Sequence, residues 1–594
     1  GYHTERESRH VRICRHGRGK RMKLLMSSGR TPEQGAQLYY KDKTEYSRET
    51  SYCFLNPMDA MDIGVEEGDH VLISSSAGKT VFAVKESSET PCGVAYLPCG
   101  PYANFILHEH THATGAPDFK GMPVEVEPTS LPIVSAWDLM EELGGLRYEV
   151  PEGTVLPGVE PGEKIIKNHA CPLCGCLCDD IELHIQDGKV TEVVNGCLLS
   201  SGKFRSEGRM VTPIRREGNE WKETDFDTAV KLAAEMFAHA KRPLFYGWSG
   251  TSTEAMHIGL EIAEEIGAVM DNCSSECHGP TIMAVQEVGH PGCTLGQVKN
   301  RADVIVYWGC NPIAAHPRHL SRYSTYSTGA FRPEGRNDRK LIVVDIRESE
   351  TAKLADIFIQ VKPGGDYALF NALRAIVRGE RDVIPDTVAG VERSVLFKTA
   401  DILLNAKFGS FFTGIGLTQS RGKYKNVRAG IELVDELNRH TKYTLTPLRG
   451  HWNVDGTNQM FSLSAGYPYA VDYSRGIVQY NPGETSGVDI LAKQEADAVL
   501  IIGTDLGAHF PRETVAHLAR INTVVLDPFI SLSTDVAKLH IPVASVGLDA
   551  EGTAYRLDGV PIHVKKAFTS AMPSDEIILT RILEEIRKIK QEHK

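Results

Sequence analysis

A chain of 594 residues, 41% hydrophobic and 24% charged, has the composition of a globular protein and the length of about four domains. Its 65 basic and 77 acidic residues give a formal net charge of −12, which argues against a nucleic-acid-binding protein. No apolar run is long enough to span a membrane. The thirteen cysteines, several of them clustered, favour metal ligation in a reducing cytoplasm over a disulfide framework.

The chain begins with a basic stretch and continues as a strand-rich region. Residues 1–21 lack apolar periodicity, so we expect a disordered extension rather than a secretory signal. Residues 22–130 contain short alternating segments separated by turns with Gly, Ser and Pro, which predicts a mostly β domain. Residues 131–165 carry many Pro and Gly without clear periodicity, which indicates a linker.

Three alternating histidines, His108, His110 and His112, lie near the end of the strand-rich region. They could form a metal site, because imidazole is a common metal ligand. Alternating polar residues are more often one face of a strand, so we favour the structural interpretation.

A compact group of thiols follows the linker. Cys171, Cys174 and Cys178 have C-x2-C-x3-C spacing, and Cys197 follows after eighteen intervening residues. The segment between alternates on both sides of Asp187-Gly188, which predicts a hairpin that returns the fourth thiol to the other three. Four thiolates suit a [4Fe–4S] cluster. A four-cysteine zinc site is the alternative, although such sites usually show two C-x2-C pairs and here only one exists.

After the cysteines, amphipathic helices alternate with buried apolar strands, which predicts parallel sheets. We therefore divide the remainder into a small iron–sulfur domain, 166–215, and α/β domains, 216–594. DVIVYWG at 303–309 resembles DAVLIIG at 497–503, and similar segments follow each. We interpret this as an internal duplication of a nucleotide-binding unit. There is no G-x-G-x-x-G motif, so NAD binding is not supported.

In such units the ligand lies at the carboxyl ends of the strands, where an acidic residue can hold a ribose or base. Strand-end Asp residues often cap helices instead, and that alternative stays open. The candidates are Gly309, Asn311 and Asp345 in the first copy, and Gly503, Asp505 and Asp527 in the second.

Two further segments indicate a reaction centre. Cys277-His278-Gly-Pro reads as a strand-to-helix loop, and a thiol beside an imidazole can be a nucleophile or a soft-metal ligand. Residues 447–487 have little periodicity, and a loop this long inside an α/β chain is usually functional. Arg449 and His451 in that loop are candidates to face an anionic substrate.

These motifs together carry a resemblance. CPLCGCLCDD, ECHGP, NPIAAHPRH, LRGHWNVDGTNQ and NPGETSGVDIL resemble the B-type subunit of the formylmethanofuran dehydrogenases, which belong to the molybdopterin oxidoreductase superfamily and are similar to formate dehydrogenases. LNPMDAMDIGVEEGDHV and LPCGPYANFI resemble the D-type subunit of the same family. The implied fold has an N-terminal barrel-like pterin-binding domain, a small iron–sulfur domain and two related Rossmann-like α/β domains.

The resemblance implies two molybdopterin guanine dinucleotides that together hold one tungsten or molybdenum. Cys277 would ligate this metal, His278 would carry the proton, and Arg449 would orient formate or CO2. The [4Fe–4S] cluster would pass electrons one at a time. Residues expected to contact the pterin cofactors, besides the strand-end candidates, are Asn104, Thr114, Gly115 and Lys203.

The implied activity is the reversible reduction of CO2 to formate, the first step of archaeal CO2 reduction in methanogenesis or its reverse. The implied partners are a zinc amidohydrolase subunit and polyferredoxin-type iron–sulfur subunits, because no second site for formyl transfer is evident in the sequence. A stand-alone formate dehydrogenase or other oxyanion oxidoreductase is one alternative. A non-catalytic iron–sulfur electron-transfer subunit is the other.

Overall fold

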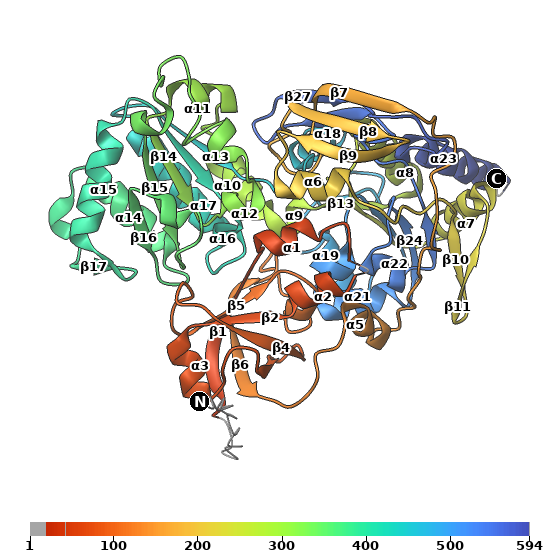
Figure 1. Cartoon of the computed structure of the whole chain (residues 1–594), viewed down its shortest axis with the longest axis horizontal. Coiled ribbons are helices and arrows are strands. Elements are labelled where there is room, and N and C mark those ends of the chain that lie inside the picture. The colour runs from red at the N-terminus through yellow and green to blue at the C-terminus, as the bar shows by residue number, and fades with distance from the viewer. Residues whose placement is uncertain (1–19, 42, 593–594) are drawn as a thin grey trace, which may run out of the picture.

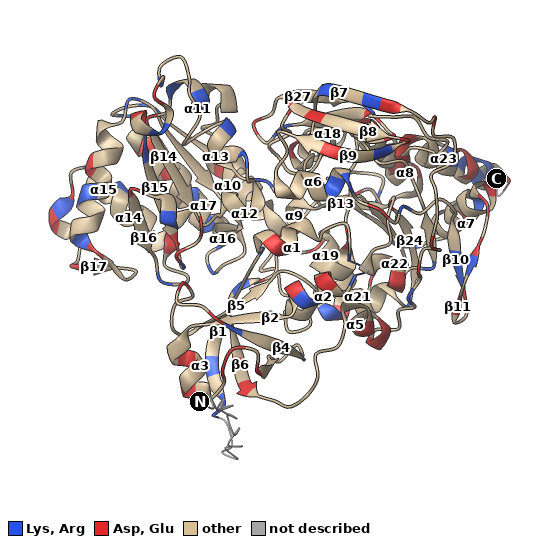
Figure 2. Ribbon diagram, in the orientation of Figure 1, with Lys and Arg blue, Asp and Glu red and all other residues tan. Residues whose placement is uncertain are grey.

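A barrel and two α/β bodies make up the described part of the chain, residues 20–41 and 43–592, in this computed structural model. Figure 1 shows the N-terminal barrel below the two α/β bodies, which lie next to each other. Basic and acidic residues are interspersed over all three bodies in the same view (Figure 2). Within the described residues, no helix combines the length and the apolar character needed to cross a membrane.

Six strands close into the barrel in the order β1–β5–β2–β4–β3–β6, with β6 pairing back to β1. The predicted β domain is therefore a barrel. Side chains alternate along the strands, so that Val71, Ile73, Phe82 and Val84 point inward and are buried. The strands are β1 (Met22–Gly29), β2 (Tyr52–Leu55), β3 (His70–Ser74), β4 (Lys79–Glu86), β5 (Val94–Pro98) and β6 (Lys120–Pro128).

Short helices fill the connections of the barrel, and three of them begin with proline, which suits the first helical turn. Thr31 and Asn56 cap two of these helices by accepting a backbone N–H. Helix α1 lies between the barrel and the α/β bodies (Figure 1). The helices are α1 (Pro32–Ala36), α2 (Thr44–Thr50), α3 (Pro57–Ile63) and α4 (Pro101–Asn104).

The cysteine-rich segment forms a small antiparallel sheet of β7 (Glu163–His169), β8 (Ile181–Gln186) and β9 (Lys189–Val194). Asp187 and Gly188 join β8 to β9 with φ angles of 51° and 74°, and a two-residue hairpin favours such positive values. The predicted hairpin is therefore confirmed. Helix α6 (Leu198–Phe204) begins directly after Cys197.

Two mainly parallel sheets form the α/β bodies. The small sheet has the order β16–β15–β14–β19–β20, and the large sheet contains the matching run β25–β24–β23–β12–β13, with antiparallel strands added at both edges. The strands are β10 (Ile214–Glu217), β11 (Glu220–Glu223), β12 (Pro243–Gly247), β13 (Val269–Asn272), β14 (Val304–Trp308), β15 (Lys340–Asp345), β16 (Ile357–Gln360), β19 (Gly409–Thr413), β20 (Tyr443–Pro447), β21 (Val471–Asp472), β22 (Gln479–Tyr480), β23 (Ala498–Ile502), β24 (Asn522–Leu526) and β25 (Leu539–Ile541).

The repeated strand order agrees with the duplication predicted from the sequence. In the large sheet, however, β12 and β13 precede the small-sheet body in the chain, and β23 to β25 follow it. The small-sheet body is thus inserted between two parts of the large one. Helices α7 (Phe226–Ala238) and α8 (Thr253–Ile266) pack with α23 (Asp575–Glu592) on the large sheet, and α14 (Asp366–Val377) packs with α17 (Tyr424–Leu437) on the small one.

Two segments differ from their sequence-based description. The expected linker 131–165 contains helix α5 (Ala136–Glu142), which the Ser135 capping box starts. The expected loop 447–487 contains helix α18 (Val454–Ala465). Both helices are too short, or too weakly amphipathic, for a periodic pattern to stand out. Residues 1–19 of the expected basic extension lie outside the described residues.

The barrel is joined to the large-sheet body by one continuous hydrophobic core. Phe105 and Ile106 after helix α4 belong to the same buried cluster as Val488 and Phe510. Buried apolar contacts of this kind fix the relative position of two bodies, because separating them would expose the apolar surface to water. The barrel therefore forms one wall of whatever site lies between the bodies.

Candidate active site

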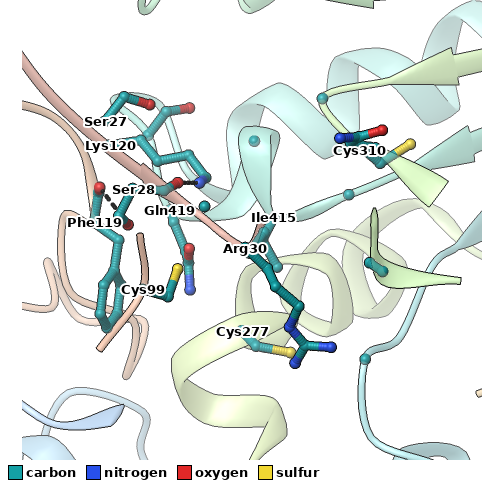
Figure 3. A pocket seen from close by; sticks show the side chains of 18 of the residues that line it. Ser27, Ser28, Arg30, Cys99, Phe119, Lys120, Cys277, Cys310, Ile415 and Gln419 are labelled. Carbon is teal, nitrogen blue, oxygen red and sulfur yellow. Dashed lines mark hydrogen bonds between the residues drawn. The ribbon is translucent and has the colours of Figure 1, made fainter. Parts of the chain in front are cut away.

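Cys277 lies in the wall of a cavity of about 520 Å³ between the barrel and the α/β bodies. Helix α9 (Ser274–Cys277) follows β13 and ends at this thiol, and α10 (Gly279–Val288) begins two residues later with Pro280 in its first turn. The predicted loop is thus the junction of two helices. Figure 3 shows Cys277 on α9 opposite barrel residues such as Ser28 and Lys120.

The environment of Cys277 is buried and mixed in charge. Burial, together with Glu276 and Cys273, raises the pKa of the Cys277 thiol, and Arg449 opposes the shift. Arg30, which follows strand β1, also lines the cavity, and its guanidinium points into it in Figure 3. A metal-binding thiol needs to lose its proton, and nearby cations favour the thiolate.

His278 lies behind the cavity wall rather than in it. The residue is fully buried, its Nε2 donates to the Leu448 carbonyl at 3.1 Å, and its Nδ1 accepts from the Thr281 hydroxyl at 3.3 Å. Burial and the charge of Arg449 lower the pKa of His278 to about 3. The imidazole is therefore neutral and both of its nitrogens are occupied.

Arg449 also turns away from the cavity. Its Nη1 donates to Asn458 and lies 3.7 Å from a carboxylate oxygen of Asp455. The neighbouring residues Leu448, Gly450 and His451 line the cavity, whereas Arg449 does not. Of the three predicted catalytic residues, only Cys277 thus faces the cavity directly.

The first copy of the strand-end candidates faces the cavity. Gly309, Asn311 and Asp345 all contribute to its lining. Gly309 has a φ angle of 62°, and a Cβ there would lie 3.1 Å from the Cα of Gly416, so a side chain would be strained. The Asn311 amide is held by Glu350, to which it donates at 2.6 Å. These three residues therefore lie together in the cavity wall, and their contact with a ligand stays a prediction.

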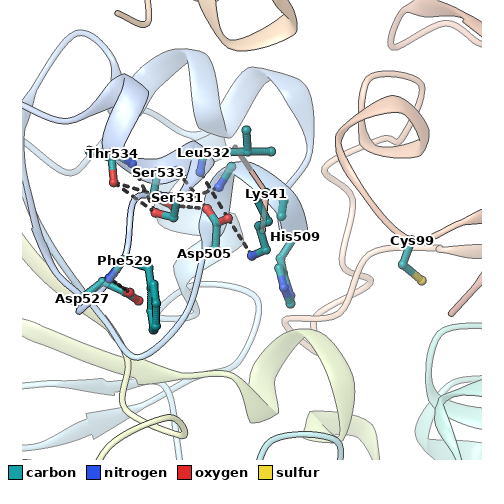
Figure 4. Close-up of polar contacts among 12 residues, drawn as sticks. Lys41, Cys99, Asp505, His509, Asp527, Phe529, Ser531, Leu532, Ser533 and Thr534 are labelled. Atoms are coloured by element: carbon teal, nitrogen blue, oxygen red, sulfur yellow. Dashed lines mark hydrogen bonds and ion pairs between the residues drawn. The ribbon is translucent and has the colours of Figure 1, made fainter. Parts of the chain in front are cut away.

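The second copy does not line this cavity. Gly503, with a φ angle of 60°, packs against Gly250 just as Gly309 packs against Gly416. The Asp505 carboxylate accepts hydrogen bonds from Lys41 at 2.7 Å and from the Ser533 backbone at 2.8 Å (Figure 4). Asp527 accepts from the Phe529 backbone at 2.8 Å. Asp505 thus holds the first turn of helix α22 (Leu532–Val536), as the helix-cap alternative proposed.

The pKa values of the two buried acids shift in opposite directions. Burial raises the pKa of Asp527 to about 7. At Asp505 burial also opposes ionisation, but the Lys41 ammonium outweighs it and lowers the pKa. Since Lys41 comes from the barrel domain and Asp505 from the large-sheet body, this ion pair joins the two.

The predicted barrel ligands occupy different positions. Asn104 lines the cavity and donates to the Ala508 carbonyl at 2.9 Å. Thr114 donates to the Thr111 carbonyl at 2.7 Å, and a Cβ on Gly115 would approach Ser275 to 3.1 Å. Thr114 and Gly115 therefore pack the barrel against residues 275–279 around Cys277 and do not line the cavity.

The cysteine-rich loop surrounds a second, small cavity. Its lining includes Cys171, Cys174, Cys176, Cys178 and Cys197. The Cys171 backbone N–H donates to the Cys178 carbonyl at 2.8 Å, which closes the loop. Within the described residues, no group of three or more His, Cys, Asp or Glu side chains is arranged to hold a single metal ion.

Salt bridges attach this loop to the small-sheet body. Arg318 donates to both carboxylate oxygens of Asp180, at 2.5 and 2.7 Å, and Arg322 pairs with Asp179 and Asp180. Bidentate pairs of this kind fix orientation as well as distance. The CDD motif thus orients the cysteines relative to the NPIAAHPRH segment.

Lys203 is buried beside the cysteine-rich loop and lines neither cavity. Its ammonium group donates to the carbonyl of Pro172, next to Cys171, and lies 5.6 Å from the ring centre of Trp452. Burial lowers the pKa of Lys203 to about 8. The expected place of Lys203 between cluster and pterin stays a prediction.

The alternating histidines do not lie on one strand, and each makes its own contacts. His108 is hydrogen-bonded to Ser76 at 2.8 Å, and His112 pairs with Asp118 at 2.6 Å. His110 stacks on the ring of His108. The expectation of a strand face at this point was wrong, because residues 108–112 form no strand in the structure.

Sequence reasoning missed several residues that line the large cavity. Arg30 and Gln34 come from the segment GRTPEQG, Lys120 is the first residue of β6, and Gln419 directly follows α16 (Ile415–Thr418). For Arg30 and Gln34, the only sequence signal of a binding site is a Gly-Arg pair before a helix that begins with proline, and this signal is weak. The other two become neighbours only through the packing of the barrel on the small sheet.

Comparison with family models agrees with this arrangement. A model described as "Molydopterin dinucleotide binding domain" matches residues 24–123, which are the barrel. A second, "Molybdopterin oxidoreductase", matches residues 209–383. The cavity lies where these two regions meet.

Three similar proteins are informative. The B-type subunit of the tungsten-containing formylmethanofuran dehydrogenase 2 of Methanocaldococcus jannaschii is 46% identical over 436 residues, which cover 72% of this chain and 99% of that protein. Protein FwdD of the same organism is 37% identical over 126 residues, covering 20% of this chain and 95% of that protein. A chain of the formyltransferase/hydrolase complex from Methylorubrum extorquens has the same fold, with a TM-score of 0.53 and 19% identity over 64% of this chain and 99% of that one.

The barrel, the cavity lined by Cys277 and the near-complete coverage of a 46% identical relative lead to the same conclusion. The chain is an oxidoreductase that belongs to the family of B-type formylmethanofuran dehydrogenase subunits and carries an FwdD-like domain at its N-terminal end.

Proposed function

We propose that this chain is the catalytic subunit of a formylmethanofuran dehydrogenase and interconverts CO2 and formate. The observation that carries the proposal is the position of Cys277, a thiol in the wall of a cavity shared by the barrel and the ends of the small-sheet strands. The centre would be tungsten or molybdenum held by two molybdopterin guanine dinucleotides. The similar B-type subunit of M. jannaschii comes from an enzyme named as tungsten-containing.

The residues of the cavity fit such a cofactor. Gly309, Gly414 and Gly416 line the cavity, and their lack of a Cβ lets the two strand ends pack closely against each other at this wall. Arg347 and Lys120 add positive charge on the same wall. A dinucleotide carries both an apolar ring face and anionic phosphates, so it needs both kinds of surface.

The metal and its dithiolenes would supply the two-electron chemistry, and the protein supplies placement and electrostatics. Cys277 would provide a thiolate ligand, and cations along the cavity would hold the formate carboxylate. We assign His278 and Arg449 supporting roles in positioning the groups around Cys277. Arg449 opposes the rise that burial causes in the pKa of the Cys277 thiol, and His278 donates to the Leu448 carbonyl beside the cavity.

For electron transfer we propose a [4Fe–4S] cluster held by Cys171, Cys174, Cys178 and Cys197. Its support is the donor set, because these thiols line one cavity. Lys203 would lie between this cluster and the pterin. We further propose a cytoplasmic complex in which iron–sulfur subunits deliver electrons and a zinc amidohydrolase subunit uses the formate. The isolated chain would then make formate but no formyl product.

The test is formate oxidation with a viologen dye by anaerobically purified Cys277→Ala and Cys277→Ser variants. We expect both to lose activity, because the metal loses its thiolate ligand, while the iron–sulfur spectrum is unchanged. The exposed Cys92 of the barrel is the control, and Cys92→Ala should be fully active. Activity retained in Cys277→Ala would overturn the proposal, and loss of the iron–sulfur spectrum would make Cys277 a structural residue.

A further inference from the structure

We propose that the barrel and the small-sheet body meet at a seam that opens as a gate for the pterin cofactor, while the barrel stays attached to the large-sheet body. Four residue pairs join the two sides of this seam: Glu89 with Lys353, Asp118 with Lys423, Tyr96 with Arg347, and Lys120 with Gln419. The inference rests on the proposed function, because the cofactor proposed there is the ligand that passes the gate. It goes beyond that function by assigning the route by which the cofactor enters and leaves.

Apolar contacts hold the barrel to the large-sheet body but not to the small-sheet body. Phe105 and Ile106 of the barrel share one buried hydrophobic cluster with Val488 and Phe510 of the large-sheet body. Among the described residues, no hydrophobic cluster combines buried side chains of the barrel with those of the small-sheet body. Separating these two bodies would therefore expose little apolar surface, and hydrophobic burial opposes this motion least.

Two of the four contacts are ion pairs outside the cavity. Asp118 Oδ1 lies 2.6 Å from Nζ of Lys423, which also donates to the Pro117 carbonyl at 3.0 Å. Glu89 pairs with Lys353, and their side chains are 29% and 49% exposed. None of these acidic and basic residues lines the cavity. Ion pairs that water reaches contribute little to stability, so they can close the seam without locking it.

The other two contacts lie in the cavity wall itself. Arg347 Nη2 donates to the Tyr96 hydroxyl at 3.3 Å, and its guanidinium carbon lies 4.3 Å from the centre of the Tyr96 ring. The Lys120 backbone N–H donates to the Gln419 carbonyl at 3.1 Å, and Figure 3 shows both residues at this wall. Since all four residues line the cavity, parting the seam opens the cavity along this wall.

Helix α1 keeps the bodies in contact at one end of the seam. It lies between the barrel and the α/β bodies (Figure 1), and it packs against α12 (Pro312–Ala315) and α6. The packing on α6 is close, because a Cβ added to Gly35 would overlap the side chain of Leu199. The seam would therefore open from its other end, with the packed end as the hinge.

The experiment measures how fast pterin leaves the full-length chain at low salt, where exposed ion pairs are least screened. Lys353→Met, Lys423→Met and the double variant are purified anaerobically, and the pterin retained during gel filtration is oxidised and quantified by fluorescence, with iron measured in parallel. Lys493→Met is the matched control, because Lys493 pairs with Glu484 at 2.6 Å inside the large-sheet body and lies outside the cavity lining.

We expect the double variant to release pterin roughly fivefold faster than the wild type, with smaller effects in the single variants and none in Lys493→Met. Because Lys353 and Lys423 do not line the cavity, faster release would not reflect a lost contact with the cofactor. Exchanging the charges of one pair, by Glu89→Lys together with Lys353→Glu, should restore the slow release that Lys353→Glu alone loses. Iron content should not change, which shows that the variants fold.

Release at the wild-type rate from every seam variant would overturn the gate and leave the proposed function intact. Fast release from the charge-exchanged variant would also overturn it, since the pair would then not act across the seam. Absence of pterin from the wild-type chain would instead contradict the proposed function.

Discussion

At the scale of single residues, the main result is that only one of the three predicted catalytic residues lines the cavity. Cys277 faces it, whereas His278 and Arg449 lie behind its wall with their polar atoms engaged. Arg30, from the barrel, points into the cavity instead. The guanidinium best placed to meet an anionic substrate is therefore one that the sequence did not single out.

This difference in position predicts that two conservative Arg→Lys variants weaken formate binding by different amounts. Arg30→Lys should raise the KM for formate roughly tenfold, because a bidentate fork becomes a point charge. Arg449→Lys should weaken formate binding less, since Arg449 acts from a distance. Steady-state kinetics with a viologen dye measures both. A larger effect at Arg449 would mean that residues 448–451 rearrange when the site is loaded, and would contradict the assignment of Arg30.

Buried histidines predict the pH dependence of stability. His540 is fully buried, donates to the Asp527 carbonyl at 2.9 Å and contacts the Thr534 hydroxyl at 3.0 Å. Burial lowers its pKa from 6.5 to about 4. The unfolded chain therefore binds a proton that the folded chain does not, and stability present above pH 6.5 is lost as the pH falls toward 4.

The contribution of His540 over this range is roughly 3 kcal/mol. Thermal unfolding midpoints between pH 7 and pH 4.5 should therefore fall less steeply in His540→Gln than in the wild type. His316, His319 and His451 also have lowered pKa values and contribute with the same sign in both proteins. Identical slopes in the two proteins would contradict the account of His540.

At the scale of elements, regular patterns could be predicted and packing could not. The β8–β9 hairpin follows from alternation around Asp187-Gly188, and the buried strands β14 and β23 follow from continuous apolar runs. Helices α5 and α18 were missed because little in the local pattern announces them. The lining of the cavity was missed at Gln34 and Gln419, since their roles depend on how separate elements meet.

The hairpin predicts which cysteines bind the proposed cluster. Cys197→Ser should abolish or strongly alter the EPR signal of the reduced cluster, because it removes the ligand that the hairpin returns to the loop. Cys176→Ser should have a mild effect, although Cys176 lines the same cavity. The two variants serve as controls for each other. If Cys176→Ser removes the signal and Cys197→Ser does not, the ligand set is wrong.

At the scale of the whole molecule, the barrel closes the site from outside the two sheets. It reaches the large-sheet body through the Lys41–Asp505 ion pair and a shared hydrophobic core, and the small-sheet body through the Lys120 N–H, which donates to the Gln419 carbonyl at 3.1 Å. The resemblance predicted a pterin-binding domain at this end of the chain. The face by which that domain completes the cavity follows only from the packing of the three bodies.

The most direct test of the account is the metal, iron and pterin content of the anaerobically purified chain. We predict one tungsten or molybdenum and two pterin guanine dinucleotides per chain, together with the four iron atoms of one cubane cluster. This composition would support the cavity as the cofactor site and the cysteine loop as the cluster site. Iron without tungsten, molybdenum or pterin would contradict the central claim, and would identify the chain as an electron-transfer subunit.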